Sequence, residues 1–402
     1  MSMLCDTTYP VMVVTSRCQA MEVEEMVRNK GARYASLVAT GVLAFGALAA
    51  CGSSDSGGGS SSGGSSGGGG SADVGVILPD TTTSPRWESQ DRPSLEKAFS
   101  DAGVKSDIQN ADGDKSKFGQ LCDSMINEGV KVIMIVNLDS ESGKACLTKA
   151  ADAGVQSIDY DRLTLGGGAS YYVSFDNVEV GSLMGKGLQD CLTAEGKNKA
   201  NIIYINGDPT DNNAALFKQG YAEALKPKIS SGDYKLVGDQ SGFWDATKAG
   251  TAFEQLYTQQ NGKIDGVVSA NDTMAGGIIS RMKANGTAGK IPVTGQDAST
   301  EGLQNILQGY QCGTVYKNTN LEAKAASDLA IALIQGDKAK ADSLATGTVK
   351  DTQTGKDVPS ALATPVWIVA NTVQKVVDDG NAKASDLCTG AIAKDCAKYG
   401  VQ

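Results

Sequence analysis

Residues 171–193 read YYVSFDNVEVGSLMGKGLQDCLT, and this stretch decides the fold. Its first five residues are almost all aromatic or β-branched, which is typical of a buried strand. The polar pair Asp176-Asn177 ends that run, and over residues 178–193 apolar side chains return at three- and four-residue spacing, which predicts a helix. The stretch is therefore a strand and a helix joined by a polar turn.

The same alternation of strand and helix repeats along the chain. Strands are predicted at 74–78, 130–136, 155–160, 171–175, 201–205, 265–269 and 291–294, and helices at 117–128, 178–193, 246–259 and 321–334. This rhythm predicts an α/β fold with parallel sheets flanked by helices. Because a single doubly wound sheet rarely holds so many units, we expect two Rossmann-like lobes, with the first crossover near Asp176.

Composition excludes several classes of function. The chain of 402 residues contains no histidine, which removes Ser-His and Cys-His nucleophile pairs and His-ligated metal sites. A net charge of −10 without a basic cluster disfavours nucleic acid as a partner. With 41% hydrophobic and 20% charged residues, the chain can bury a substantial core.

The N-terminal region has the pattern of an export signal. Arg28, Lys30 and Arg33 precede a weakly polar run, residues 35–50, that is short for a membrane-spanning helix. It ends in Leu48-Ala49-Ala50-Cys51-Gly52, which resembles the bacterial lipobox, so we expect residues 1–51 to hold a signal peptide with Cys51 as the lipidation site. The alternative is a non-lipidated signal peptide or a short membrane anchor.

Two segments flank this signal. An acidic stretch at Glu22, Glu24 and Glu25 does not suit a signal peptide, so residues 1–25 look like an over-long translation start. Residues 52–72 are almost entirely Gly and Ser and predict a flexible tether with a reach of roughly 25 Å. Together these features predict an extracytoplasmic protein anchored to the cell membrane, with its folded part at residues 73–402.

Six cysteines lie in the predicted folded part. They are Cys122, Cys146, Cys191, Cys312, Cys388 and Cys396. An even number in an exported protein favours disulfides, although six cysteines permit fifteen pairings. The local pair Cys388–Cys396 is preferred, Cys122–Cys146 is the second suggestion, and buried free thiols are the alternative.

Polar side chains follow the predicted strands. Open α/β sheets bind ligands at the carboxyl ends of their strands. The groups there are Asp80, Asp161, Arg162, Asp176, Asn177, Asp208, Asp211, Asn212, Asn213, Asn271, Asp272, Gln296, Asp297 and Lys317. For Asp80, Asp208 and Asp272 we prefer helix or turn capping. The remaining planar and charged groups match adjacent hydroxyls, so the set predicts a polyol ligand.

Trp87 and Trp244 each lie in a polar loop near a strand end. Sugars present an apolar C–H face that an aromatic ring covers, which favours a stacking role over core packing, the alternative. The first strand is followed by Pro79-Asp80-Thr81-Thr82-Thr83-Ser84, not by G-x-G-x-x-G, and no Walker A sequence occurs. We therefore expect no nucleotide, metal or other cofactor.

The order and spacing of the strand-end residues resemble those of the periplasmic D-xylose-binding proteins, within the ribose-type group of sugar-binding proteins. The resemblance spans about residues 73–365. It is carried by Arg86-Trp87, Tyr160-Asp161-Arg162, Ser174-Phe175-Asp176-Asn177, Asp211-Asn212-Asn213-Ala214, Val237-Gly238-Asp239-Gln240, Ser269-Ala270-Asn271-Asp272, Gly295-Gln296-Asp297-Ala298, Thr314-Val315-Tyr316-Lys317 and Asp357-Val358-Pro359-Ser360.

The resemblance implies the periplasmic-binding-protein type I fold, two lobes joined by three crossover segments. We place the N-terminal lobe at residues 73–176 plus 318–350 and the C-terminal lobe at 177–317 plus 351–402. It further implies that sugar binds between the lobes without any chemistry. Trp87 and Trp244 would stack on the sugar, and hydrogen bonds to it would come from Arg86, Asp161, Arg162, Asn213, Asn271, Asp297 and Lys317. For Asp211 and Asn212 the sequence does not decide which side chain points toward the sugar.

The implied partners are a monosaccharide, D-xylose first, and an ABC transporter permease with its ATPase. A chemoreceptor is a second partner that the sequence leaves open. The loop before Trp244 is shorter and the loop after Trp87 longer than usual in that family, so glucose and ribose remain alternatives. Two other classes are alternatives: a sugar-converting enzyme, and a transcription regulator, which would need a helix-turn-helix where this chain has a signal peptide. We expect a binding protein.

Overall fold

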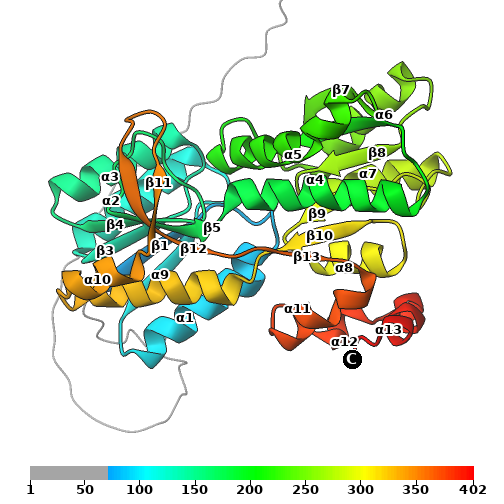
Figure 1. Cartoon of the computed structure of the whole chain (residues 1–402). Coiled ribbons are helices and arrows are strands. Elements are labelled where there is room, and N and C mark those ends of the chain that lie inside the picture. The colour runs from blue at the N-terminus through cyan, green and yellow to red at the C-terminus, as the bar shows by residue number, and fades with distance from the viewer. Residues whose placement is uncertain (1–70) are drawn as a thin grey trace, which may run out of the picture. The chain divides into compact units, whose positions relative to one another are not determined.

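The computed structural model describes residues 71–402 (Figure 1). The predicted signal peptide, Cys51 and nearly all of the tether lie outside the described residues. The described chain forms two α/β lobes. Residues 71–402 contain no helix that is both long and apolar enough to cross a membrane.

The N-terminal lobe is built on a seven-stranded sheet in the order β11-β12-β5-β4-β3-β1-β2. All pairs are parallel except the β11–β12 pair. The strands are β1 (Val74–Leu78), β2 (Ser106–Asn110), β3 (Val132–Ile135), β4 (Gln156–Tyr160), β5 (Tyr171–Phe175), β11 (Gly347–Lys350) and β12 (Asp357–Ala363). The helices are α1 (Arg92–Asp101), α2 (Lys115–Glu128), α3 (Ser140–Asp152), α9 (Thr319–Ile334) and α10 (Lys338–Leu344).

Both faces of this sheet are buried, because successive strand residues point to opposite sides. Val76 packs in a cluster with Leu95 of α1 and Leu329 of α9, whereas the next residue, Ile77, packs with Phe118 of α2. Helices α1 and α9 therefore cover one face and α2 and α3 the other (Figure 1).

The C-terminal lobe has two three-stranded pieces, β7-β6-β8 and β13-β10-β9. A single parallel bridge, Val267 to Val293, joins them. The strands are β6 (Ala200–Asn206), β7 (Tyr234–Ser241), β8 (Gly266–Ser269), β9 (Thr294–Gln296), β10 (Gly313–Tyr316) and β13 (Val366–Ile368). The helices are α4 (Asn177–Ala194), α5 (Asn212–Ser230), α6 (Ala246–Gln259), α7 (Asp272–Ala284), α8 (Thr300–Leu307), α11 (Gln374–Asp378), α12 (Ala384–Leu387) and α13 (Ala393–Tyr399).

The chain crosses between the lobes three times within the described residues. The crossovers join β5 to α4, β10 to α9, and β12 to β13. The predicted lobe boundary at residue 350 is wrong, because β12 pairs in parallel with β5 and so belongs to the first sheet. The third crossover therefore lies between Ala363 and Val366. The strand predicted at 291–294 is also displaced to Thr294–Gln296, since Pro292 lacks the N–H that a strand ladder needs.

Three disulfides tie the described chain together. Cys122–Cys146 and Cys388–Cys396 confirm the two pairings suggested from the sequence. The third, Cys191–Cys312, joins the end of α4 to the residue before β10. Residues 370–402, which we call the C-terminal segment, pack against α8 of the C-terminal lobe (Figure 1).

Candidate functional site

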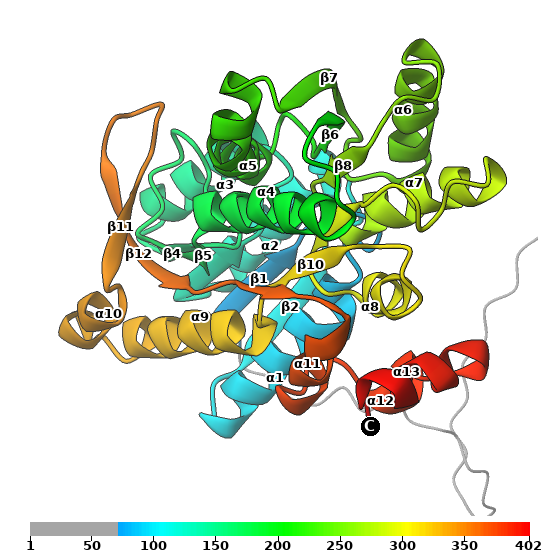
Figure 2. The ribbon, with the colours of Figure 1, turned by 45° about the vertical axis from the view of Figure 1, so that its right-hand side comes forward.

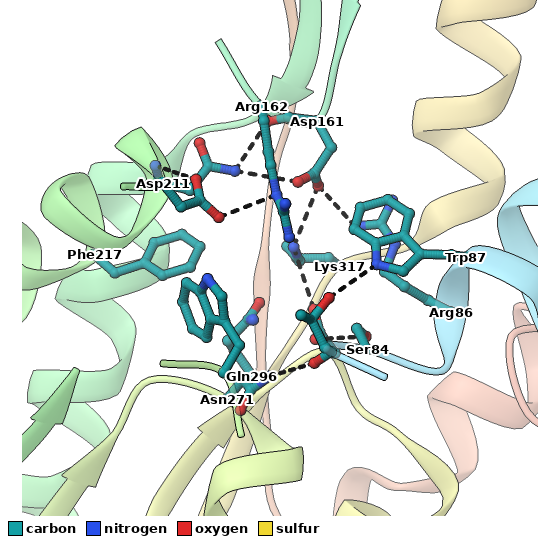
Figure 3. A pocket seen from close by; sticks show the side chains of 14 residues that line it. Ser84, Arg86, Trp87, Asp161, Arg162, Asp211, Phe217, Asn271, Gln296 and Lys317 are labelled. Atoms are coloured by element: carbon teal, nitrogen blue, oxygen red, sulfur yellow. Dashed lines mark hydrogen bonds and ion pairs between the residues drawn. The ribbon is translucent and has the colours of Figure 1, made fainter. Parts of the chain in front are cut away.

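A cavity lies where the carboxyl ends of strands from both lobes meet. The N-terminal lobe contributes residues that follow β1 and β4, and the C-terminal lobe contributes residues that follow or end β6, β7, β8, β9 and β10. Figure 3 shows these side chains converging from the two sides. The lining residues are Thr83, Ser84, Arg86, Trp87, Asp161, Arg162, Asp211, Asn213, Phe217, Trp244, Asn271, Gln296, Asp297 and Lys317.

The lobes touch each other around this cavity. Ser84 Oγ donates to Asp297 Oδ2 at 3.0 Å, and Asn271 Nδ2 donates to the Thr83 carbonyl at 3.1 Å. On the opposite side, Asn213 Nδ2 donates to the Asp161 carbonyl at 2.9 Å. Each bond joins one lobe to the other, so the structure represents a closed arrangement.

Arg86 is the most heavily bonded group of the site. Its Nε and Nη2 donate to the two carboxylate oxygens of Asp91 at 2.8 and 2.7 Å, and its Nη1 donates to Asp161 Oδ2 at 2.8 Å. Nη2 also donates to Glu322. A guanidinium has five N–H donors in a rigid fork. Four are therefore used within the protein, and one N–H on Nη1 remains for a ligand.

Asp161 is held between three cations. Burial alone would raise its pKa, but Lys317, Arg86 and Arg162 outweigh burial and lower the pKa of Asp161 to about 2. Lys317 Nζ lies 3.5 Å from Asp161 Oδ2 and 3.2 Å from Asp297 Oδ1. Burial would lower the pKa of Lys317, and these carboxylates raise it above its usual value. Both groups are therefore charged at neutral pH.

The charged side chains that line the cavity are equal in number, with Arg86, Arg162 and Lys317 beside Asp161, Asp211 and Asp297. Arg162 Nε lies 3.0 Å from Asp211 Oδ2, which completes a set of three cations, each beside at least one carboxylate. Leaving any of these groups unpaired in the interior would be costly. A ligand with a net charge would disturb this balance, so the site suits an uncharged polar molecule.

Some buried polar atoms in the cavity have no protein partner. Within residues 71–402, Trp244 Nε1 and Gln296 Oε1 are both buried and neither takes part in a hydrogen bond. Asp297 Oδ1 accepts no hydrogen bond of good geometry, although Lys317 Nζ is close. An unsatisfied buried polar atom is destabilising by about 1–3 kcal/mol. These atoms offer one N–H donor and two oxygen acceptors to a ligand, in addition to the free N–H of Arg86.

Backbone strain is concentrated at the same place. Asp161, Trp244 and Asp297 have φ values of 61°, 58° and 98°, in the left-handed region. The Asp161 turn is held by Tyr172 Oη and Ser174 Oγ, which donate to its carbonyl at 2.9 and 2.8 Å. Residues in such conformations persist only where their surroundings fix them, and they cluster at functional sites.

The aromatic residues surround the cavity. The rings of Phe217 and Trp244 meet edge to face with centroids 6.2 Å apart. Trp87 lies under the guanidinium of Arg86, whose Cζ is 4.5 Å from the ring centroid. Gly207 makes room for Trp244, because a Cβ at that position would lie 2.0 Å from the indole ring.

Every residue that the sequence predicted to contact a sugar lines this cavity. Asp211, whose role the sequence did not decide, also lines the cavity, whereas Asn212 does not. Sequence reasoning missed Thr83, Ser84 and Phe217 as lining residues, and it listed Gln296 only as a strand-end group. Phe217 could have been predicted from the sequence, because it lies one helical turn after Asn213 on α5 and therefore on the same face of that helix.

The three residues interpreted as capping groups do not line the cavity. Asp80 accepts from the backbone N–H groups of Thr82 and Thr83, and Asp208 accepts from that of Thr210. Asp272 was expected to cap a helix or turn, but the N-cap of α7 is Asn271. The described residues contain no group of three or more Cys, Asp and Glu placed to hold a metal ion.

The matching family is described as the periplasmic binding protein domain, and it covers residues 74–338. The chain is 35% identical to the D-xylose-binding periplasmic protein of Escherichia coli, over 78% of this chain and 92% of the relative. It is also 35% identical, over the same shares, to the multiple sugar-binding periplasmic receptor of Rhizobium radiobacter.

The chain belongs to the periplasmic sugar-binding proteins of the type I fold. A carbohydrate transporter solute-binding protein from Chloroflexus aurantiacus, solved in complex with D-glucose, superposes with a TM-score of 0.71 at 28% identity. That match covers 79% of this chain and 98% of the solved chain. The α/β fold and the expectation of a binding protein in place of an enzyme are thereby confirmed.

Proposed function

We propose that this sugar-binding protein captures an uncharged monosaccharide between its lobes and delivers it to an ABC importer, with D-xylose as the first candidate. The observation that carries the proposal is a charge-balanced cavity in which Trp244 Nε1 and Gln296 Oε1 have no protein partner. A neutral polyol supplies both donors and acceptors for such atoms. Phosphorylated and carboxylated sugars would add an unpaired negative charge.

The choice of D-xylose is supported by relatives named for that sugar in Escherichia coli and Haemophilus influenzae. Two considerations keep D-glucose as the alternative. A relative of equal identity is named for multiple sugars, and a solved protein from Clostridium phytofermentans, with a TM-score of 0.70 and 28% identity, holds β-D-glucose. The class of ligand therefore has broader support than the individual sugar.

Aromatic and polar groups divide the recognition of the sugar. Trp87 and Trp244 would cover its C–H faces, and the charged groups that line the cavity would bind its hydroxyls. Because groups from both lobes surround the cavity, a sugar makes all its contacts only when the lobes close. Binding then shifts the population toward the closed form, to an extent set by how much more tightly the sugar binds the closed form than the open form.

The closed form is the transport signal in this proposal. A permease with its ATPase would recognise surfaces of both lobes in that arrangement. Lipidation at Cys51 and the Gly/Ser tether would keep the protein close to the membrane. Mass spectrometry of the membrane-bound protein should find an acylated N-terminal cysteine, and a soluble mature form that begins elsewhere would remove the anchor from the proposal.

Calorimetry and thermal unfolding of the protein without its signal peptide test the ligand class. The panel is D-xylose, D-glucose and D-ribose, with D-glucuronate and D-glucosamine as charged counterparts. A sugar at 100 times its Kd stabilises the folded chain by about 2.7 kcal/mol. We expect that stabilisation from D-xylose and none from the charged sugars. Equal binding of D-glucuronate would contradict the charge argument. Binding of D-glucose alone would make D-glucose the ligand in place of D-xylose.

A further inference from the structure

Asn381 lies in the C-terminal segment and is 92% buried, with 8% of its surface exposed. It follows Gly380, whose φ of 76° turns the chain after α11. The segment itself belongs to the C-terminal lobe, since Val373 and Val376 pack with Leu303 and Ile306 of α8. The side chain of Asn381 nevertheless faces the other lobe.

The amide of Asn381 uses its full bonding capacity. Nδ2 donates to Thr319 Oγ1 at 2.6 Å and to Gln90 Oε1 at 3.3 Å. Oδ1 accepts from Tyr316 Oη at 2.7 Å and from Asn320 Nδ2 at 3.2 Å. Three of these four partners belong to the N-terminal lobe, and Tyr316 belongs to β10, at the second crossover.

The backbone around Asn381 makes further bonds across the same boundary. Gln90 Nε2 donates to the Asn381 carbonyl at 3.0 Å, and Asn320 Nδ2 donates to the Asp379 carbonyl at 3.2 Å. In Figure 2, α11 lies beside the first turn of α9 and close to α1. A short stretch of the C-terminal lobe therefore packs against two elements of the N-terminal lobe, the helical turn Trp87–Asp91 and the start of α9.

One of these elements begins with a residue that lines the cavity, and the other begins just after one. Gln90 stands in the single helical turn Trp87–Asp91, which begins with one lining residue and ends with the carboxylate that holds Arg86. Thr319 opens α9, two residues after Lys317. Neither Gln90 nor Asn381 lines the cavity. Any effect of Asn381 on sugar binding would therefore act through the contact between the lobes and not through contact with the sugar.

We infer that Asn381 is a positioning residue that clasps the two lobes in the closed, sugar-holding arrangement. This inference rests on the proposed function. The clasp stabilises the closed form, so it slows the escape of a bound sugar. Capture changes little, because the sugar enters those molecules of the free protein whose lobes are apart, while the clasp holds the others closed. The C-terminal segment thereby sets how long the closed form lasts.

Stopped-flow tryptophan fluorescence tests the clasp, because Trp87 and Trp244 line the cavity and report on sugar directly. Asn381→Ala in the mature chain should raise the dissociation rate constant about tenfold, the effect of losing one or two interlobe hydrogen bonds. The association rate constant should stay within about twofold. An unchanged dissociation rate would overturn the inference.

Two further variants separate the clasp from damage to the segment. Gln374→Ala is the matched control, since, among residues 71–402, the side chain of Gln374 bonds only Asp378 and Gln402, both in the C-terminal segment. It should leave the dissociation rate unchanged, and an increase equal to that of Asn381→Ala would reject the clasp. Gln90→Met removes the bonds of Gln90 to both the side chain and the carbonyl of Asn381, so it should also raise the dissociation rate, and an unchanged rate would count against the clasp.

Failure of the clasp and failure of the proposed function give different results. If the unmodified protein binds no sugar in the panel, the proposed function fails. The clasp is then tested by small-angle X-ray scattering without ligand, where Asn381→Ala should have a larger radius of gyration than the unmodified chain. Equal radii would then overturn the clasp. If the unmodified protein binds sugar and all three variants release it at the same rate, only the clasp fails.

Discussion

Arg162 of the N-terminal lobe and Asp211 of the C-terminal lobe form an ion pair across the cavity, with Nε 3.0 Å from Oδ2. Both side chains are at most 9% exposed. Burial raises the pKa of Asp211, and Arg162 opposes that rise. Asp211 also caps α5, because it accepts from the Asn213 N–H at 2.9 Å. One carboxylate thus orders a helix start and joins the lobes.

Replacing this carboxylate by an amide separates its two roles. Asp211→Asn keeps the cap, since Asn is as good an N-cap as Asp, but leaves Arg162 without its counter-charge. We expect sugar affinity to fall by about 2 kcal/mol, roughly 30-fold in Kd. Calorimetry at pH 7.5 measures the change. Asp208→Asn, in a half-buried turn outside the cavity, is the control, and equal Kd values for both variants would contradict a role for the ion pair.

A second prediction concerns pH and the buried carboxyl of Asp272. Burial raises its pKa to about 7, even though Gln311, Ser299 and Thr314 donate hydrogen bonds to it. The native chain therefore keeps a proton on Asp272 that the unfolded chain releases near pH 4. Because the native state binds more protons, its free energy of unfolding falls as pH rises from about 4 to about 7.

The slope from one such group approaches about 1.4 kcal/mol per pH unit. Asp159, whose pKa burial also raises to about 7, adds a similar slope. Asp272→Asn cannot titrate, so the variant should lose one group's share of the slope while being less stable at pH 5. Urea unfolding at pH 5, 6 and 7 tests this. Parallel pH profiles for the two proteins would show that Asp272 is ionised throughout.

Much of the site followed from the sequence because its residues obey a local rule. Asp161, Asn271 and Asp297 each lie within three residues of the end of a predicted strand, where an α/β sheet brings polar groups together. The pairing of β12 with β5 has no such local signature. It depends on contacts between residues 188 positions apart, such as Ser360 and Tyr172, and so the third crossover was misplaced.

The sequence also gave no sign of what the C-terminal segment does. Residues 370–402 break into short helices, and their contacts depend on how α8 and the second crossover are placed in space. Asn381 has the ordinary look of a turn residue after Gly380. Only the geometry shows that its amide bonds both lobes.

The disulfides should differ in their effect on stability. In the chain-entropy model, a cross-link stabilises in proportion to the logarithm of the loop that it closes. Cys191 and Cys312 are 121 residues apart, whereas Cys388 and Cys396 are 8 apart. Replacing both cysteines of the long pair by serine should reduce the free energy of unfolding by about 5 kcal/mol, and of the short pair by about 2.5 kcal/mol.

Denaturant unfolding under oxidising conditions measures both disulfide variants. The short pair lies wholly within residues 370–402, so its removal also shows whether a change inside the C-terminal segment by itself alters sugar affinity. Neither pair touches the cavity, so sugar affinity should change little in either variant. A larger loss of stability from the short pair would contradict the loop-length argument.

The last prediction uses Gly207, which packs against the indole of Trp244. Gly207→Ala would put a methyl group 2.0 Å from Trp244 Cζ2, so the ring must move. Overpacking of this kind destabilises by about 1–3 kcal/mol. Because Trp244 lines the cavity, we also expect about a tenfold loss of sugar affinity, from lost stacking and a misplaced Nε1 donor. Thermal unfolding and calorimetry on the same samples measure the two effects.

Two companion variants separate these effects. Gly119→Ala on α2 adds the same methyl group where nothing lies within 4 Å, so it should leave affinity unchanged and stabilise the helix by up to about 1 kcal/mol. Adding Trp244→Leu to Gly207→Ala removes the clash, so stability should recover in part while sugar affinity stays low. Recovery of affinity along with stability would show that Trp244 packs beside the sugar without binding it.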